Sequence, residues 1–284
     1  MTTSAAFLPD RGVVRVSGAD AASFLQNLLT NDVEGLAPGE ARYAALLTPQ
    51  GKILFDFLVV RTTADADGCY ILDCDGARAA DLAKRLSLYK LRAKVTIADE
   101  SAERGVIACW RGEPDDVSGG VSYRDPRAPG LGYRAILPHA AAEAAGEAVA
   151  GEYEALRIGL GVPKGGVDFA YGDVFPHDAD MDLLAGVDFK KGCYVGQEVV
   201  SRMKHRGEAR KRVARVRLEG PPPSPGAEVS DGERPVGALG SSSGRQALAL
   251  LRLDRVEEAV AAGRTLSAGG VVLHLIEDPQ TNVA

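Results

Sequence analysis

Residues 191–198 read Lys-Gly-Cys-Tyr-Val-Gly-Gln-Glu, and they form the chemically densest stretch in this chain of 284 residues. One glycine stands directly before Cys193 and another three residues after it, which permits a tight backbone path around the thiol. From Gln197 to Lys204 the apolar residues recur at helical spacing. We therefore expect a glycine-hinged loop that presents Cys193 just before the N-terminus of a helix.

Cations stand close to this loop in the sequence. Lys190 and Lys191 precede Cys193, and residues 204–206 read Lys-His-Arg. Positive charge and a helix N-terminus both stabilise a thiolate over a neutral thiol. The sequence thus predicts that Cys193 attacks an electrophile or ligates a soft metal centre, with Lys191 beside it in the catalytic set.

Other interpretations of Cys193 stay open at this point. Free cysteine is often a small buried residue without chemistry. A cysteine hydrolase needs a base, and His177 and His205 are available, but the sequence pairs neither of them with the thiol. An iron–sulfur cluster usually needs four protein ligands, so a cluster at Cys193 would draw the others from a second subunit, a partner or a small thiol.

The composition is that of a globular protein with more than one lobe. The chain exceeds the length at which a single hydrophobic core stops growing, and 45% of its residues are hydrophobic. Its net charge of −6 argues against a general nucleic-acid binder. We find no pattern of a secretory signal and no apolar run long enough to cross a membrane. Four scattered cysteines favour a reducing compartment, so we expect a cytoplasmic protein.

Hydrophobic periodicity upstream of the loop predicts an α+β unit with a mainly antiparallel sheet. The turn signal Thr-Pro-Gln-Gly at 48–51 joins two strands into a hairpin. No Gly-x-Gly-x-x-Gly follows a strand, so a Rossmann fold has no support, and the Gly- and Pro-rich stretch 114–129 is typical of a loop. The expected strands cover 12–16, 42–47, 52–61, 69–73, 94–98 and 131–137, and the expected helices cover 21–29, 76–88, 140–158 and 197–204.

A domain boundary is predicted near residue 210. Residues 1–210 then form one region with two lobes, and residues 211–284 form a second domain. Short strands separated by turns are typical of a small β-barrel. The expected barrel strands cover 212–218, 235–239, 247–253 and 270–276.

The string at 191–198 resembles the hallmark of the YgfZ family of folate-binding proteins, which is related to the glycine cleavage T-protein and includes a mitochondrial iron–sulfur assembly factor. Similar segments stand at 17–33, 48–56, 89–95 and 155–163, so the resemblance covers most of residues 10–210. It implies a T-protein-like cloverleaf of ferredoxin-like sheets with a C-terminal barrel. It also implies tetrahydrofolate as a ligand and a role in iron–sulfur cluster assembly, with tRNA modification as an associated process.

The same resemblance indicates where folate would bind. A pterin edge needs a carboxylate, its ring an aromatic slot and its glutamate tail a cation. Asp56 would meet the edge, although a solvent-facing hairpin charge is the alternative, and Arg157 would meet the tail unless it forms a surface salt bridge. The remaining expected contacts are Tyr43, Tyr194, Lys191, Gln197, Glu198 and Arg202.

One departure separates this chain from the T-protein. Gly159 stands where the T-protein pattern has an acidic residue, and glycine cannot do acid–base work. We therefore expect a tetrahydrofolate-binding accessory factor that acts through the Cys193 loop, without a stably bound metal. Its expected partners are folate and iron–sulfur assembly or client proteins, with no membrane and no nucleic acid. A folate-dependent aminomethyl or one-carbon transferase is the alternative, and a docking scaffold without folate is the third hypothesis.

Overall fold

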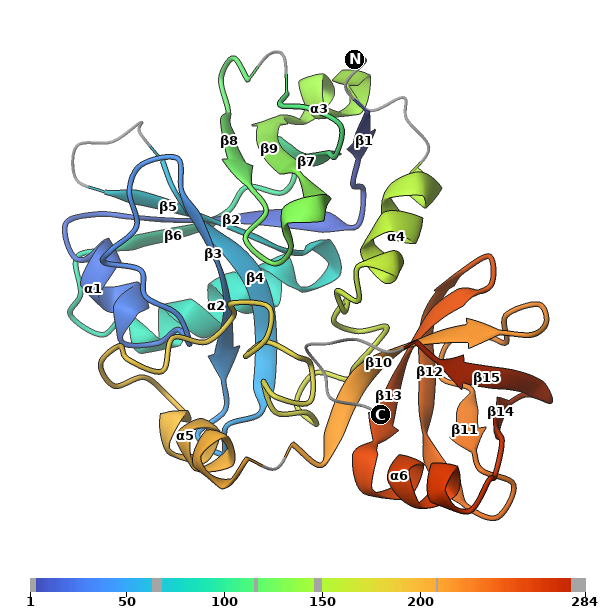
Figure 1. Ribbon diagram of the computed structural model, residues 1–284. Coiled ribbons are helices and arrows are strands. Elements are labelled where there is room, and N and C mark those ends of the chain that lie inside the picture. The colour runs from blue at the N-terminus through green and yellow to red at the C-terminus, as the bar shows by residue number, and fades with distance from the viewer. Residues whose placement is uncertain (1–3, 63–67, 115–116, 146–149, 208, 277–284) are drawn as a thin grey trace.

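Three antiparallel sheets, one of them closed into a barrel, form the three lobes of the computed structural model (Figure 1). The structure describes residues 4–62, 68–114, 117–145, 150–207 and 209–276. A long irregular segment, residues 160–196, passes between the lobes (yellow-green to yellow in Figure 1). The predicted α+β cloverleaf with a C-terminal barrel is confirmed.

The first sheet carries helices on one face and meets the second sheet with the other. Neighbouring strand residues alternate between two cores: Val13 joins the core shared with the second sheet, and Val14 joins the core under the helices. Leu82 and Leu86 fill the helix-side core. In sheet order the strands are β3 (Ala41–Leu47), β4 (Ile53–Arg61), β5 (Cys69–Asp75), β2 (Arg11–Ser17) and β6 (Thr96–Asp99), and the helices are α1 (Ala21–Gln26) and α2 (Ala79–Tyr89), the latter after a short 3-10 turn, η1 (Gly76–Arg78).

The second sheet packs its inner face against the first. Val106 and Ile136 lie in the shared core, whereas Ile107 and Leu137 point to the outer side, where Ala142 of a helix covers them. In sheet order its strands are β1 (Ala5–Phe7), β7 (Arg104–Cys109), β9 (Tyr133–Pro138) and β8 (Val121–Arg124), and the covering helix is α3 (His139–Ala145). A 3-10 turn, η2 (Pro129–Leu131), separates β8 from β9.

The third lobe is a closed six-stranded barrel with its own core. Helix α4 (Ala150–Gly159) contacts β12 and β13 and so joins the barrel to the rest of the chain. The barrel elements are β10 (Lys211–Leu218), β11 (Glu228–Ser230), β12 (Pro235–Ser243), β13 (Gln246–Arg252), α6 (Leu253–Ala261), β14 (Leu266–Ala268) and β15 (Val271–Leu275).

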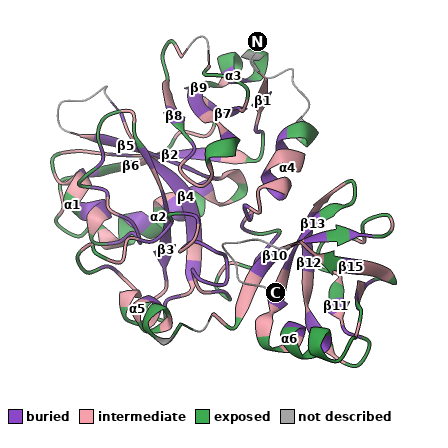
Figure 2. Ribbon diagram, in the orientation of Figure 1, coloured by how far each residue is buried: buried purple, intermediate pink, exposed green. Residues whose placement is uncertain are grey.

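The irregular segment is part of the core despite its lack of regular structure. Phe169, Met181 and Tyr194 lie in the core shared by the first two sheets. Figure 2 shows this burial as purple ribbon between the lobes, in contrast to the green outer sides of α3, α4 and α6. The segment leads into α5 (Gln197–Arg206), the helix that the sequence predicts at 197–204.

A buried ionic network joins the two sheets. Asp73 on β5 accepts hydrogen bonds from Arg11 Nε (2.6 Å), Arg134 Nη1 (2.6 Å) and the hydroxyl of Tyr123 (2.9 Å). Arg134 also donates from Nε to Asp125 (3.1 Å) and from Nη2 to the hydroxyl of Tyr153 on α4 (3.0 Å). Burial alone would raise the pKa of Asp125, but its arginine partners lower that pKa to about 2.

Some predicted elements differ from the structure. The predicted helix 21–29 ends at Gln26, and the stretch 140–158 is α3 and α4, with residues 146–149 outside the described residues. β8 lies within the stretch 114–129 that was expected to be a loop. Four further strands were not predicted. β1, β11 and β14 have three residues each, too few to show an alternating pattern. β7 shows no alternation because five of its six residues are buried. Helix α6 was also not predicted.

We expect Asp73→Asn to lower the free energy of unfolding by about 3–5 kcal/mol, because it leaves Arg11 and Arg134 buried without their shared carboxylate. Urea unfolding followed by circular dichroism measures the change. Asp81→Asn, at an exposed position of α2, is the matched control and should change stability by less than about 0.5 kcal/mol. Equal stability of the two variants would show that the network does not hold the sheets together.

Candidate functional site

Cys193 lies at the surface on the loop that precedes α5. All four cysteines are among the described residues; Cys193 is exposed, whereas Cys69, Cys74 and Cys109 are buried. The interpretation of Cys193 as a small buried residue is therefore wrong. The thiol is open to an electrophile, a metal centre or a partner chain.

Lys191 anchors this loop to the end of α1. Its ammonium donates to the carbonyl oxygens of Gln26 (2.7 Å), Leu29 (2.7 Å) and Asn31 (2.9 Å). These contacts use all three of its protons, and burial lowers the pKa of Lys191 to about 8. They give Lys191 a positioning role in place of the catalytic role expected from the sequence. The carbonyl of Gln26, the last residue of α1, thus has a hydrogen-bond donor from outside the helix.

The turn after α1 holds the chain just upstream of the loop. The amide of Asp188 donates to the carbonyl of Thr30 (2.9 Å), and the hydroxyl of Thr30 donates to the carbonyl of Gly186 (2.7 Å). Asn31 Nδ2 donates to the carbonyls of Ala185 (2.6 Å) and Tyr43 (2.8 Å). The Thr-Asn pair therefore binds the loop through the main chain.

Two glycines dock the downstream half of the loop onto the β3–β4 hairpin turn. Gly196 has φ +82°, and a Cβ there would lie 2.6 Å from the carbonyl oxygen of Thr48 and 3.0 Å from Cα of Gly51. Gly51, at φ +79°, faces Val199 of α5, 3.0 Å from where its Cβ would lie. Only glycine permits so close an approach in this conformation.

The cations predicted near the thiol have other contacts. Lys191 lies 5.3 Å from the centroid of the Tyr194 ring, and Lys204 lies 3.6 Å from that of Phe189. His177 is buried against Phe189, at 5.9 Å between ring centroids, and burial lowers its pKa. These contacts give no support to thiolate stabilisation by these cations or to a Cys193–His177 hydrolase.

The predicted folate contacts that follow Cys193 differ in their burial. Tyr194 is buried in the core, and Gln197 is a half-buried residue at the first position of α5. Glu198 and Arg202 form an exposed ion pair at 2.6 Å.

Asp56 is buried between two tyrosine hydroxyls. Tyr43 donates to Oδ2 at 2.9 Å and Tyr171 donates to Oδ1 at 2.6 Å. The interpretation of Asp56 as a solvent-facing hairpin charge is wrong, and Tyr43, only 1% exposed, cannot line an open slot without rearrangement. A Cβ at Gly165 would lie 2.1 Å from the Tyr171 hydroxyl, so glycine makes room for this arrangement. Tyr171 was not predicted as a site residue, because it stands in an irregular stretch without periodicity.

Arg157 is buried at the junction between α4 and the barrel. It donates to Asp168 (3.0 Å), to Ser241 Oγ of β12 (2.7 Å) and to Glu154 (2.7 Å). Neither expected role fits, because this side chain is neither a surface ion pair nor free to bind a glutamate tail. Gly159, at the end of α4, lies at the same junction and accepts a hydrogen bond from Arg215 on its carbonyl oxygen (2.9 Å).

A cavity of about 390 Å³ lies beside α5. Its walls combine the apolar side chains of Phe175, Val199 and Met203 with four cations and one carboxylate, those of Lys52, Arg202, Arg210, Lys211 and Asp178. Lys52 lies over the Phe175 ring, 3.6 Å from its centroid. Arg202 is the predicted folate contact that lines this cavity.

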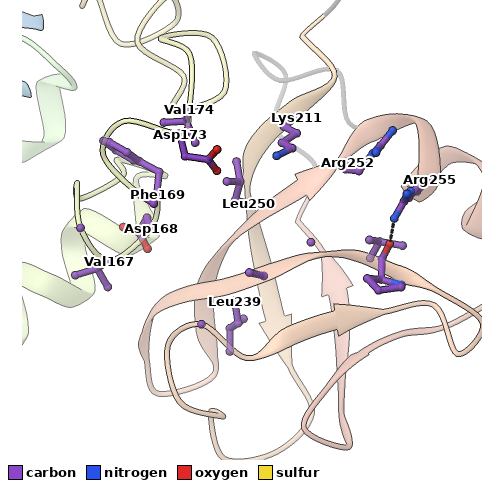
Figure 3. A pocket seen from close by; sticks show the side chains of 17 residues that line it. Val167, Asp168, Phe169, Asp173, Val174, Lys211, Leu239, Leu250, Arg252 and Arg255 are labelled. Atoms are coloured by element: carbon purple, nitrogen blue, oxygen red, sulfur yellow. Dashed lines mark hydrogen bonds between the residues drawn. The ribbon is translucent and has the colours of Figure 1, made fainter. Parts of the chain in front are cut away.

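A second cavity, of about 460 Å³, lies between the irregular segment and the barrel. Figure 3 shows Phe169 and Val174 on one side and Lys211, Leu250 and Arg252 on the other. Lys211 lines both cavities. Among the described residues no group of three His, Cys, Asp or Glu side chains is placed to hold a metal ion, and no helix there is long and apolar enough to cross a membrane.

Two family models match parts of the chain. The model described as the GCVT N-terminal domain matches residues 10–110, and that of the CAF17 C-terminal beta-barrel domain matches residues 210–280. Among solved structures, the glycine cleavage system aminomethyltransferase T from Bartonella henselae superposes with a TM-score of 0.76 over 98% of this chain and 86% of that one. Sequence identity is 17%, so this likeness shows the fold alone.

Curated relatives are more similar in sequence. The mitochondrial iron-sulfur cluster assembly factor IBA57 of Mus musculus is 34% identical over 279 residues, which cover 88% of this chain and 78% of the relative. The IBA57 homolog of Mycosarcoma maydis, also named mitochondrial, is 38% identical over 78% of this chain, which spans 59% of that relative's length. Both relatives are named mitochondrial, so the prediction of a cytoplasmic location is wrong. The finer assignment to the YgfZ family stays a prediction.

We expect Lys191→Met to speed amide hydrogen exchange in residues 188–196 by at least about tenfold, because three carbonyl oxygens lose their shared donor. Exchange followed by mass spectrometry measures this. Lys190→Met, at an exposed neighbouring position, is the control and should leave exchange unchanged. Equal protection in both variants would mean that Lys191 does not hold the loop.

Proposed function

This chain belongs to the family of IBA57 iron–sulfur cluster assembly factors, and we propose that it acts in iron–sulfur cluster assembly through the Cys193 thiol. The observation that carries the proposal is an exposed cysteine on an anchored loop. Lys191 fixes the loop on one side of the thiol and Gly196 fixes it on the other. A thiol held in this way loses little freedom when it binds iron.

The cluster would be cargo shared with another molecule. Cys193 supplies one thiolate, whereas a cluster usually takes four protein ligands. Among the described residues Cys193 is not part of any group of three or more His, Cys, Asp or Glu side chains placed to hold a metal ion. The other ligands would therefore come from a partner, which is an assembly or client protein of the iron–sulfur pathway, or from a small thiol.

We also propose that tetrahydrofolate binds at the cavity beside α5. Phe175, Val199 and Met203 offer an apolar wall to a ring, and the four cations around it suit the carboxylates of a glutamate tail. Lys52 directly precedes β4, and Asp56 lies four residues further along the chain, a distance of roughly 13 Å in an extended backbone. A pterin that reached Asp56 would have to displace the hydroxyl of Tyr171, which is only partly buried.

A folate-dependent one-carbon transferase is the second candidate. The buried carboxylate of Asp56, held between two hydroxyls, favours it, because such a group could orient a reacting amine. The position of Gly159 at the barrel junction weighs against aminomethyl transfer, since it offers no side chain there.

Cys193→Ala should abolish the rescue of iron–sulfur enzyme activity in cells that lack this protein, without changing the melting temperature, because the side chain is exposed. Lys190→Ala is the matched control at an exposed neighbour and should rescue fully. The measurement is the activity of an iron–sulfur enzyme in cell extract, at equal levels of each variant. Full rescue by Cys193→Ala would exclude the proposed role of the thiol.

Calorimetric titration with tetrahydrofolate should give a binding heat that Arg202→Ala and Lys211→Ala each weaken by about tenfold, since each removes a charged contact. Arg217→Ala, exposed on β10, should bind as the wild type does. An absence of binding heat in the wild type would favour the docking scaffold without folate.

A further inference from the structure

The end of α2 presents apolar side chains to solvent. Leu88 is 65% exposed and Leu91 is 91% exposed, although large aliphatic side chains normally contribute to a core. Leu91 also has φ +43°, a left-handed conformation that leucine adopts at a cost. At this exposure Leu91 buries almost no apolar surface against the rest of the fold.

The turn that carries Leu91 is firmly held. The amide of Ala93 donates to the carbonyl of Lys90 (2.7 Å), and the amide of Lys94 donates to a carboxylate oxygen of Asp20 (2.7 Å). A Cβ at Gly18 would lie 2.3 Å from the carbonyl oxygen of Lys94, so the turn also packs closely against the chain before α1. Leu91 is thus displayed by a fixed turn.

Cations surround the two leucines. Residues 84–94 read Lys-Arg-Leu-Ser-Leu-Tyr-Lys-Leu-Arg-Ala-Lys, with five cations and no acidic residue in a chain of net charge −6. All five cationic side chains are exposed, and none forms an ion pair with a described residue. We call Leu88, Leu91 and these cations the α2 surface; the cations are Lys84, Arg85, Lys90, Arg92 and Lys94.

Grooves adjoin this surface. One, of about 390 Å³, has Leu54, Phe55 and Leu88 as its apolar residues, and its polar residues are three cations and one carboxylate: Arg78, Lys84, Arg85 and Asp81. The other, of about 290 Å³, lies against Tyr89 and Ala93 and extends to Asp20, Asn27 and Leu28. Asn27 and Leu28 lie in the chain between Gln26 and Leu29, whose carbonyls Lys191 binds. The surface therefore offers apolar recesses as well as charge.

We propose that the α2 surface docks a protein partner through an acidic segment with apolar side chains. Complementary charge would guide such a segment to the five cations, while its apolar side chains would pack on Leu88 and Leu91 and fill the grooves. A nucleic acid would use the cations but not the leucines, and a bilayer would leave the grooves unfilled. The α2 surface does not include Cys193, and the proposal does not depend on the chemistry of the thiol.

The test places a photoreactive amino acid at position 91 of the full chain in cells. We expect a crosslink to a protein segment of net negative charge, identified by mass spectrometry, that Lys90→Glu with Arg92→Glu reduces at least tenfold. The same amino acid at position 260 is the matched control, because Val260 is an exposed apolar residue (52%) on the barrel helix α6. Cys193→Ala should leave the crosslink unchanged, so a failure here is distinguishable from a failure of the thiol's role.

A second variant separates docking from folding. With the photoreactive residue at position 88, Leu91→Asn should reduce the crosslink at least tenfold without lowering the melting temperature, because asparagine tolerates the left-handed conformation. Crosslinks only to nucleic acid or lipid, a crosslink insensitive to charge reversal, or a level no higher than at position 260 would each overturn the proposal.

Discussion

The guanidinium of Arg134 uses each of its three nitrogens on a different part of the fold. Nη1 binds Asp73 of the first sheet, Nε binds Asp125 beside the second sheet, and Nη2 binds Tyr153 of α4. One helical turn after Tyr153, Arg157 makes a similar link: it joins α4 to the barrel by donating to Ser241. The relative placement of all three lobes thus depends on two buried arginines, whose fixed fork geometry sets direction as well as attraction.

The same network continues to the candidate pterin contact. Arg127 forms a salt bridge with Asp125 at 2.6 Å and lies 5.7 Å from the centroid of the Tyr43 ring, and Tyr43 donates to Asp56. Three arginines and three carboxylates lie along this path, so their charges are equal in number. They are Arg11, Arg127 and Arg134 with Asp56, Asp73 and Asp125. Asp56 serves the charge balance of the interior, so any ligand that binds it has to supply hydrogen bonds in place of the two hydroxyls.

Local pattern was enough to predict the β3–β4 hairpin, α5, the barrel and the place of Cys193 on a glycine-hinged loop just before a helix. Each of these shows its periodicity or its turn residues within a short window. The partners of Lys191, Asp56 and Arg157 could not be predicted, because they lie up to 165 residues away in the chain. The prediction of a cytoplasmic location was wrong for a different reason. Scattered cysteines indicate a reducing environment, which more than one compartment provides.

The contact between Gly51 and Gly196 has a further consequence. Main chain meets main chain there, so the position of the loop relative to the hairpin is set by the number of residues in each turn and hardly by their side chains. Substitutions at the solvent side of either turn would leave the position of the loop unchanged. An insertion or a deletion of a single residue in either one would shift the glycines past each other and carry Cys193 out of place, so the two turns are constrained in length more strictly than in composition.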